Sequence, residues 1–356
     1  MSIGSLRYIQ VKRMLLEHIA SLKPHDRLPS RTVLSETYQA ARTTIERAVS
    51  ELIGEGVLYA RDGSGTYVSD AAGLNQGSGA AGRTWGLLIP DILHYIYPGI
   101  LRGVSDVASE GDVNLIVCHT DNDYPKQTRH LRKLIDTGVD GIVVVPAITG
   151  TVDMSPFYEL QAAGVPFVFC HRMLEGIQAP RVISNNFYAG YIAAKHLLAN
   201  GCERIGYISR PVYSASSERY QGFVCALAEA NVPVRGEWVA FEPTFEPAGE
   251  GYESALRMLR GAEKPDGLFC FNDGIAKGAC DAAREAGLSV GKDIRVVGCD
   301  NTNICDTMPV PLTSVKFPTY EMGAQAARLL LDGALDGSRT VVLQPELIVR
   351  GSSAAT

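Results

Sequence analysis

Hydrogen-bonding side chains follow two of the strand-like apolar runs in the second half of the chain. Asn272 and Asp273 come directly after the run GLFCF, and Asp300 comes directly after VVGC. Carboxylate and amide groups can each make two hydrogen bonds in one plane, which suits the hydroxyls of a sugar. These residues therefore predict a small-molecule site. Asp273 has a second interpretation, as the residue that holds the N-terminus of the helix that follows it.

Other candidates lie at the ends of further apolar runs. His171 and Arg172 close the run PFVFCHR. Tyr95 and Tyr97 follow the run WGLLIP, and Phe317 follows LTSVK. Imidazole and guanidinium groups hydrogen-bond polar ligands, and aromatic faces could stack on the C–H face of a sugar ring. Simple packing of the aromatic rings in a cleft is an equally open interpretation.

The elements that must position these residues alternate between strand and helix. The strand-like runs are WGLLIP, VNLIVCH, GIVVVPA, PFVFCH, RIGYIS, GLFCFN and IRVVGCD, and helical segments such as QTRHLRKLIDTG separate them. Near-continuous Val, Ile and Leu runs between helices predict parallel sheets covered on both faces, which is the α/β class. This part of the chain has about 270 residues, which is large for one such sheet and suits two similar lobes. Ligands of such sheets bind beyond the carboxyl ends of the strands, where the candidates lie.

The N-terminal segment has a different pattern. Apolar residues recur at helical spacing over residues 8 to 22 and 45 to 53, and Ser30 is a good N-cap for a short helix between them. Asp62-Gly63 between the runs VLYAR and TYV predicts a β-hairpin. Three helices followed by a hairpin are the order of a winged helix-turn-helix, whose third helix enters the major groove of DNA.

That interpretation predicts which residues meet double-stranded DNA. Those near the start of the third helix, together with one basic residue of the second, are candidates for base or phosphate contacts: Arg31, Arg42, Thr43, Thr44 and Arg47. Gly63 and Gly65 at the hairpin tip allow positive φ and a close approach of backbone N–H groups to phosphate. A surface hairpin without contacts is the alternative for the tip.

Composition sets the domain boundaries and the class of protein. Residues 69 to 84 are rich in Gly, Ala and Ser, so we expect a DNA-binding domain at 1 to 69, a flexible linker at 70 to 83 and a sensor at 84 to 356. The net charge is −6, but residues 1 to 69 hold nine Lys and Arg against seven Asp and Glu, which gives +2 there and −8 elsewhere. Neither a transmembrane run nor a signal peptide is expected, and eight scattered cysteines suit a reducing cytoplasm.

Motifs that would indicate an enzyme occur only out of context. GSGAAG at 77 to 82 matches a dinucleotide-binding pattern but lies in the expected linker. GLSVG at 287 to 291 matches a nucleophile elbow but runs from helix to strand, the reverse of the required order. We therefore expect no catalytic residues, no metal site and no cofactor.

The N-terminal segment resembles the GntR family of bacterial regulators over about residues 6 to 69. The stretches RLPSRTVLS, ARTTIERAVSELIGEGVLY and RDGSGTYV carry the resemblance in order. Two residues depart from the family pattern. Ala41 stands where a capping Ser is usual, and Glu46 stands where an Arg usually reads bases or phosphate. Glu46 can accept from a cytosine amino group but repels phosphate, which leaves the operator sequence open.

The larger part resembles the ligand-binding domain of LacI/GalR-type repressors. The stretches YIAAKHLLANGCERIGYIS, ERYQGFVCAL, PDGLFCFNDGIAKGACDAAREAGLSVGKDIRVVGCDN and EMGAQAARLLLDG carry it. The resemblance implies a two-lobe, periplasmic-binding-protein-like sensor with Arg219 as a sugar-binding arginine, whereas His171 departs from the usual Asp. A GntR-type reader joined to such a sensor is similar to arabinose-responsive repressors. It implies a homodimer that binds operator DNA and a small-molecule effector, a sugar by preference, with a nucleobase or a phosphorylated compound as the alternative.

Overall fold

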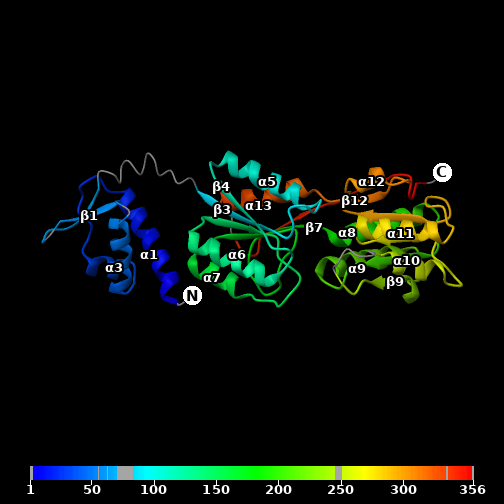
Figure 1. Ribbon diagram of the computed structural model, residues 1–356, viewed down its shortest axis with the longest axis horizontal. Coiled ribbons are helices and arrows are strands. Elements are labelled where there is room, and N and C mark those ends of the chain that lie inside the picture. Colours follow the sequence, from blue (N-terminus) through cyan, green and yellow to red (C-terminus); the bar gives the residue numbers. More distant parts are fainter. Residues whose placement is uncertain are drawn as a thin grey trace.

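The computed structural model describes residues 3–54, 56–61, 63–69, 83–244, 251–333 and 336–354. A small N-terminal part and two α/β lobes follow one another along the long axis of the molecule (Figure 1). The predicted linker lies outside the described residues except for Arg83, and so does Asp62 of the predicted hairpin. Among the described residues no helix is long and apolar enough to cross a membrane.

The small part has the predicted order of a winged helix-turn-helix. Its elements are α1 (Ile3–Ala20), α2 (Arg31–Thr37), α3 (Arg42–Gly54) and an antiparallel hairpin of β1 (Leu58–Arg61) and β2 (Gly65–Val68). Ser30 caps α2 by accepting a hydrogen bond from the Val33 N–H at 3.4 Å. The helical spacing in α3 predicted its inner face, and four of its residues are fully buried in the core of this part: Ile45, Ala48, Val49 and Leu52.

The first lobe, here the N-lobe, is built on a six-stranded parallel sheet of order β13-β7-β6-β5-β3-β4. One apolar core joins the sheet to α5 and α13, and a second joins it to α6 and α7. The elements are β3 (Thr84–Ile89), α5 (Tyr97–Glu110), β4 (Asn114–His119), α6 (Tyr124–Thr137), β5 (Gly141–Val144), α7 (Ser155–Ala163), β6 (Phe167–Cys170), β7 (Arg181–Ser184), α13 (Thr319–Leu331) and β13 (Thr340–Leu343).

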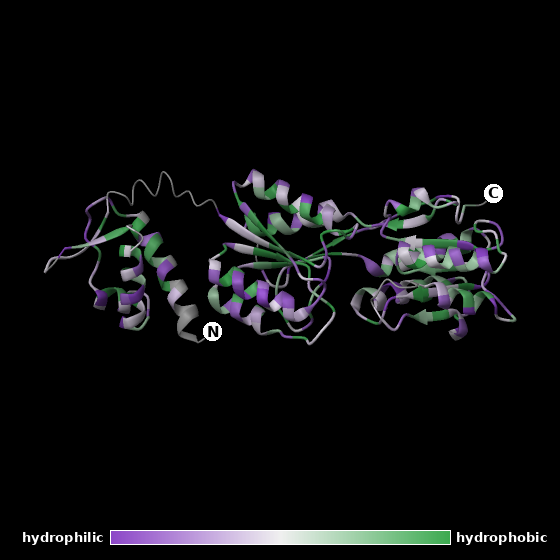
Figure 2. Cartoon of the chain, viewed as in Figure 1, coloured by the Kyte–Doolittle hydropathy of each residue, from purple (hydrophilic) through white to green (hydrophobic). Residues whose placement is uncertain are grey.

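The second lobe, the C-lobe, repeats this plan with strand order β14-β12-β11-β10-β8-β9, in which only β14 is antiparallel to its neighbour. Figure 2 shows hydrophobic residues concentrated in the strands of both lobes. The elements are α8 (Asn186–Ala199), β8 (Ile205–Ser209), α9 (Ser214–Glu229), the 3-10 helix η1 (Gly236–Trp238), β9 (Val239–Phe241), α10 (Tyr252–Leu259), β10 (Gly267–Cys270), α11 (Asp273–Glu285), β11 (Arg295–Cys299), α12 (Ile304–Thr307), β12 (Thr313–Lys316) and β14 (Glu346–Ile348).

The chain crosses between the lobes at three places. It passes from β7 to α8, returns from β12 to α13, and passes again from β13 to β14. The side chains of Asn185 and Gln344 tie the first crossing to the third through a hydrogen bond of 3.2 Å. The two-lobe α/β architecture predicted from the sequence is therefore confirmed.

β4 is one place where the sheets, predicted to be covered on both faces, are open to solvent. β4 is the edge strand of the N-lobe sheet, and its residues are exposed or half-buried, with Val117 at 39% exposure. The apolar run VNLIVCH predicted strand formation correctly. It did not reveal that the strand has a neighbour on one side only.

Candidate functional site

A cleft of about 570 Å³ lies between the lobes. Its wall combines residues from the ends of β3 and β6 in the N-lobe with residues that follow β8, β10 and β11 in the C-lobe. Eight of the nine residues predicted to bind an effector line it: Tyr95, Tyr97, His171, Arg172, Arg219, Asn272, Asp273 and Asp300. The ninth, Phe317, is buried behind the wall and packs on Arg219.

Arg219 is the most constrained of the predicted residues. Its side chain is only 2% exposed, and its guanidinium lies 4.1 Å from the ring centre of Phe271 and 4.7 Å from that of Phe317. Nε donates to Asn186 Oδ1 at 3.0 Å, and Nη1 donates to the Phe271 carbonyl at 2.5 Å. Aromatic faces attract the cation and the two acceptors fix its plane, so the guanidinium is held in one orientation at the cleft.

Two glycines allow α8 and α9 to lie close enough to place Arg219. A Cβ on Gly190 would overlap the Arg219 carbonyl, and a Cβ on Gly222 would overlap the Phe187 carbonyl. The helix backbones therefore touch where any larger side chain would separate them. This close packing of α8 on α9 fixes the position of Arg219 relative to Asn186 in α8.

Asn272 and Asp273 on the C-lobe wall have different roles. Asn272 Oδ1 accepts from the Ile275 N–H at 2.8 Å, so Asn272 caps α11 and the capping role considered for Asp273 belongs to its neighbour. Asp273 accepts from the Thr302 N–H at 2.7 Å and from the Ser314 hydroxyl at 2.6 Å. Burial raises the pKa of Asp273 to about 6.

Asp300 has the properties of a ligand-binding residue. It follows β11 with a φ of 97°, and its buried Oδ1 atom has no hydrogen-bond partner among the residues that the structure describes. Burial raises the pKa of this carboxyl, and the nearby Arg219 opposes the rise. A buried acceptor without a partner costs free energy, and a ligand hydroxyl would remove that cost.

The N-lobe wall is organised around Tyr97, which is buried at the start of α5. Arg172 Nη2 donates to the Tyr97 hydroxyl at 2.9 Å, and the rings of His94 and His171 lie 5.3 and 6.2 Å from the Tyr97 ring. Arg172 Nη1 also donates to Asn122 Oδ1 at 2.7 Å. We call these four residues, Tyr97, His94, His171 and Arg172, the Tyr97 group.

His171 is held in an unusual conformation within this group. Its φ is 66°, in the left-handed region that residues other than glycine rarely adopt. Burial, together with the charges of Arg172 and Arg219, lowers the pKa of His171 well below its usual value of 6.5. The imidazole is therefore neutral at physiological pH, and its buried Nδ1 atom has no hydrogen-bond partner within the described ranges.

Sequence reasoning missed several residues of the cleft. Asn122, Arg210 and Tyr213 line it, and so does His94 of the Tyr97 group. His94 lies beside the predicted Tyr95, so its position after the first strand was a usable signal. Tyr213 lies with its ring centre 5.9 Å from the Arg172 guanidinium, a contact between lobes that no local pattern indicates.

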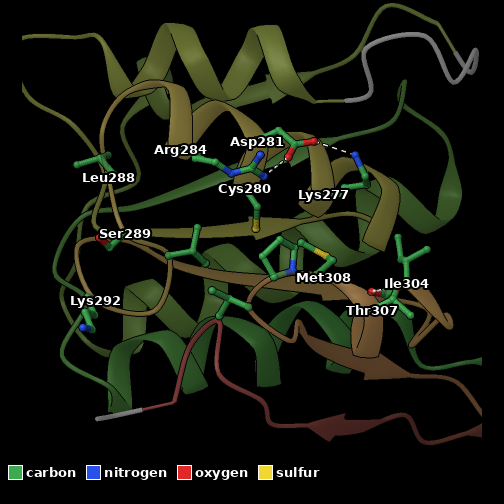
Figure 3. A pocket seen from close by; sticks show the side chains of 13 residues that line it. Lys277, Cys280, Asp281, Arg284, Leu288, Ser289, Lys292, Ile304, Thr307 and Met308 are labelled. Carbon is green, nitrogen blue, oxygen red and sulfur yellow. Dashed lines mark hydrogen bonds and ion pairs between the residues drawn. The ribbon is translucent and has the colours of Figure 1, made fainter.

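A second hollow, of about 540 Å³, lies on the C-lobe (Figure 3). It is lined by residues of α11 and α12 and of the two segments that follow them, and Asp281 pairs there with Lys277 and Arg284. None of the nine predicted effector residues lines it. The predicted ligand chemistry therefore belongs to the interlobe cleft.

The candidate DNA interface lies on α3 and the hairpin. Arg42 and Thr43 are exposed at the start of α3 and Thr44 is half-buried, while Arg42 Nε pairs with Glu46 at 3.0 Å. Arg31 Nη2 donates to Thr66 of β2 at 3.0 Å, which joins the second helix to the hairpin. At the hairpin tip, Gly63 and Gly65 have φ angles of 71° and 130°.

Two arginines of the small part have ring contacts that the sequence did not indicate. The Arg47 guanidinium lies 4.4 Å from the ring centre of Tyr8 in α1. Arg61, exposed at the end of β1, lies 5.5 and 5.4 Å from the ring centres of Tyr59 and Tyr67, which stack on each other. Arg61 thus adds a cation to the hairpin beside its two tip glycines.

Comparison with known families agrees with this division of the chain. Residues 7–68 match the family described as bacterial regulatory proteins, gntR family. Residues 194–353 match the periplasmic binding protein-like domain.

Individual relatives match over most of their length. The chain is 29% identical to an arabinose metabolism transcriptional repressor of Geobacillus stearothermophilus, over 98% of this chain and 97% of that protein. It is 35% identical to the HTH-type transcriptional repressor PurR of Mannheimia succiniciproducens, over 71% of this chain and 76% of that protein. A LacI family regulator from Enterococcus faecium, solved with bound ribose, is 28% identical with a TM-score of 0.64, and the match covers 77% of this chain and all of that one.

Proposed function

Because this chain belongs to the bacterial transcriptional repressors that join a helix-turn-helix reader to a periplasmic-binding-protein-like domain, we propose that a sugar bound between its lobes controls its affinity for operator DNA. The observation that carries the proposal is the interlobe cleft, where eight residues selected from the sequence converge. In this proposal residues 1 to 69 bind DNA in the cytoplasm, residues 70 to 83 link the two domains, and residues 84 to 356 bind the effector.

The chemistry of the cleft supports a polyhydroxylated ligand. Asp300 offers an acceptor without a partner, Arg219 offers a fixed donor, and Tyr95 offers an aromatic face that is 54% exposed. Sugar hydroxyls both donate and accept, and their ring C–H groups pack on aromatic faces. A nucleobase is the second candidate, favoured by the likeness to PurR repressors.

DNA recognition is proposed to use α3 in the major groove and the hairpin on the backbone. The exposed Arg42 and Thr43, with Thr44, would meet base edges, while Arg31 and the amides at Gly63 and Gly65 would meet phosphate. Arg47 stays a candidate contact, although it must then leave the Tyr8 ring. We further propose a homodimer, because paired readers bind a pseudo-palindromic operator, and sedimentation equilibrium of the full chain tests it.

Two measurements test the proposed function. Selection from a random duplex pool, followed by fluorescence anisotropy, should yield a sequence that the parent binds and that Arg42→Ala and Thr43→Ala bind more weakly. Arg284→Ala, outside the reader, is the matched control. A pool that yields no preferred sequence contradicts the regulator.

The effector is tested by thermal shift against pentoses, hexoses and purines. A ligand at about 100-fold its Kd stabilises the folded state by about 2.7 kcal/mol, which is a visible shift. A sugar that both raises the melting temperature and changes operator affinity supports the proposal. A purine that does so alone replaces the sugar with a nucleobase and leaves the regulator intact.

A further inference from the structure

Charged side chains in the cleft differ in whether other protein groups already contact their charged atoms. Four carboxylates line the cleft, and three of them are engaged by protein donors. Asp121 pairs with Lys126 at 2.5 Å, Asp91 accepts from the Leu93 N–H at 2.8 Å, and Asp273 accepts from two donors. Of these four, Asp300 keeps a buried oxygen that has no hydrogen-bond partner among the described residues.

Two arginines of the cleft have no acidic partner. The acceptors of Arg172 are Asn122 Oδ1, the Pro146 carbonyl and the Tyr97 hydroxyl, and those of Arg219 are Asn186 Oδ1 and the Phe271 carbonyl. Within the described part of the chain, neither guanidinium forms a salt bridge with a carboxylate. A guanidinium is always charged. The charge of Asp300 acts on both groups through space, but no carboxylate of the described residues contacts either one, so these two cations favour an anionic ligand.

The unpartnered nitrogen atoms lie together on the N-lobe wall. His94 Nδ1, His171 Nδ1 and Arg172 Nε are buried and have no hydrogen-bond partner in the part of the chain that the structure describes, and all three belong to the Tyr97 group. Burial lowers the pKa of His171 most, and the charges of Arg172, Arg219 and His94 lower it further, so cations surround the imidazole. Burial raises the pKa of Tyr97 to about 12, so its hydroxyl adds no negative charge.

We propose that the effector is a sugar carrying anionic oxygens, either a carboxylate or a phosphate. Its anionic group contacts the Tyr97 group, and its hydroxyls face Asn272 and Asp300 on the C-lobe wall. This inference rests on the proposed sugar-responsive function and adds the charge of the ligand to it. Orientation follows from the same charges, because Asp300 repels an anionic group placed beside it and accepts from a hydroxyl.

Matched sugars test the inference by isothermal titration of the full chain. Galactose, galacturonate and galactose 6-phosphate form one set, and glucose, glucuronate and glucose 6-phosphate form another. We expect at least one acid or phosphate to bind about tenfold or more tightly than its neutral parent, which is the effect of one charge-assisted hydrogen bond. The acid and phosphate arms identify the source of the anionic oxygens.

A charge variant locates the preference in the Tyr97 group. His171→Asp places a carboxylate beside Arg172 and should reduce the ratio of anionic to neutral affinity about tenfold or more. His171→Asn is the neutral comparison and should retain the ratio, and the melting temperature of each variant without ligand reports folding.

Each remaining outcome overturns the inference in a recognisable way. Neutral sugars that bind as tightly as their acids and phosphates overturn the anionic group and leave the sugar function standing. Binding of purines alone overturns both. Failure of every acid and phosphate to bind at millimolar concentration, or an unchanged ratio in His171→Asp, also overturns the inference.

Discussion

Replacing Arg219 by Met tests its contribution to ligand binding, with folding measured separately. Met keeps a long, flexible apolar chain between the Phe271 and Phe317 rings but removes the charge and five donors. A charge-assisted hydrogen bond contributes about 1.5–3 kcal/mol, so effector affinity should fall roughly 10- to 150-fold.

The stability of the folded state depends on a different set of contacts from those that hold the effector. Asn186 Oδ1 and the Phe271 carbonyl would lose their donor, at about 1–3 kcal/mol each where water cannot reach them. Removal of a buried charge that has no acidic partner offsets part of this loss. We therefore expect a melting temperature below that of the parent.

Isothermal titration with the effector and thermal unfolding without it measure the two effects. Arg219→Lys keeps the charge but cannot reproduce the planar fork, so its affinity should lie between those of the parent and Arg219→Met. Arg204→Met is the matched control, because Arg204 is half exposed and pairs with Asp266 outside the cleft. Parental effector affinity in a less stable Arg219→Met protein would refute the reasoning and make Arg219 purely structural.

Three further changes test how the fold supports the sites. Burial raises the pKa of Asp273 from 3.8 to about 6, so the folded state loses about 3 kcal/mol as the pH rises through this range and the buried carboxyl ionises. Urea unfolding should show this loss in the parent and not in Asp273→Asn; parallel pH profiles would contradict it. Gly222→Ala should separate α8 from α9, lower the free energy of unfolding by about 1–3 kcal/mol and weaken effector binding. Gly236→Ala is the control and should have none of these effects, because no other atoms of the described residues lie near that position. Ala41→Ser should cap α3 and stabilise it by about 1 kcal/mol, seen as slower hydrogen exchange of its amides, while unchanged exchange would show that the site gains no cap.

The local sequence pattern was sufficient to predict the elements that form from neighbouring residues. The spacing of Ile45, Ala48, Val49 and Leu52 predicted both α3 and its buried face. The runs before Asn272 and Asp300 predicted two parallel strands, and parallel strands bring their carboxyl ends to one edge. That geometry alone places these two residues in one cleft.

Contacts between distant segments could not be predicted in this way. β7 has the short sequence RVIS, and its partner β13 lies more than 150 residues further along the chain, where Arg181 Nε donates to Thr340 Oγ1 across a separation of 159 residues. Neither segment has a long apolar run that would predict a strand. The contact of Arg172 with Tyr213 likewise exists only because the two lobes face each other.

The position of Arg219 relative to the lobe crossings links ligand binding to lobe movement. Asn186, which accepts from its Nε, directly follows the first crossing, and Phe317, which packs on its guanidinium, lies in the second. Rotation of the lobes changes backbone angles at these crossings, because the sheets on either side are rigid. A ligand that contacts both Arg219 and the Tyr97 group therefore favours one arrangement of the two lobes over the other. The free energy available to change DNA affinity is the difference between the free energies with which the ligand binds the two lobe arrangements.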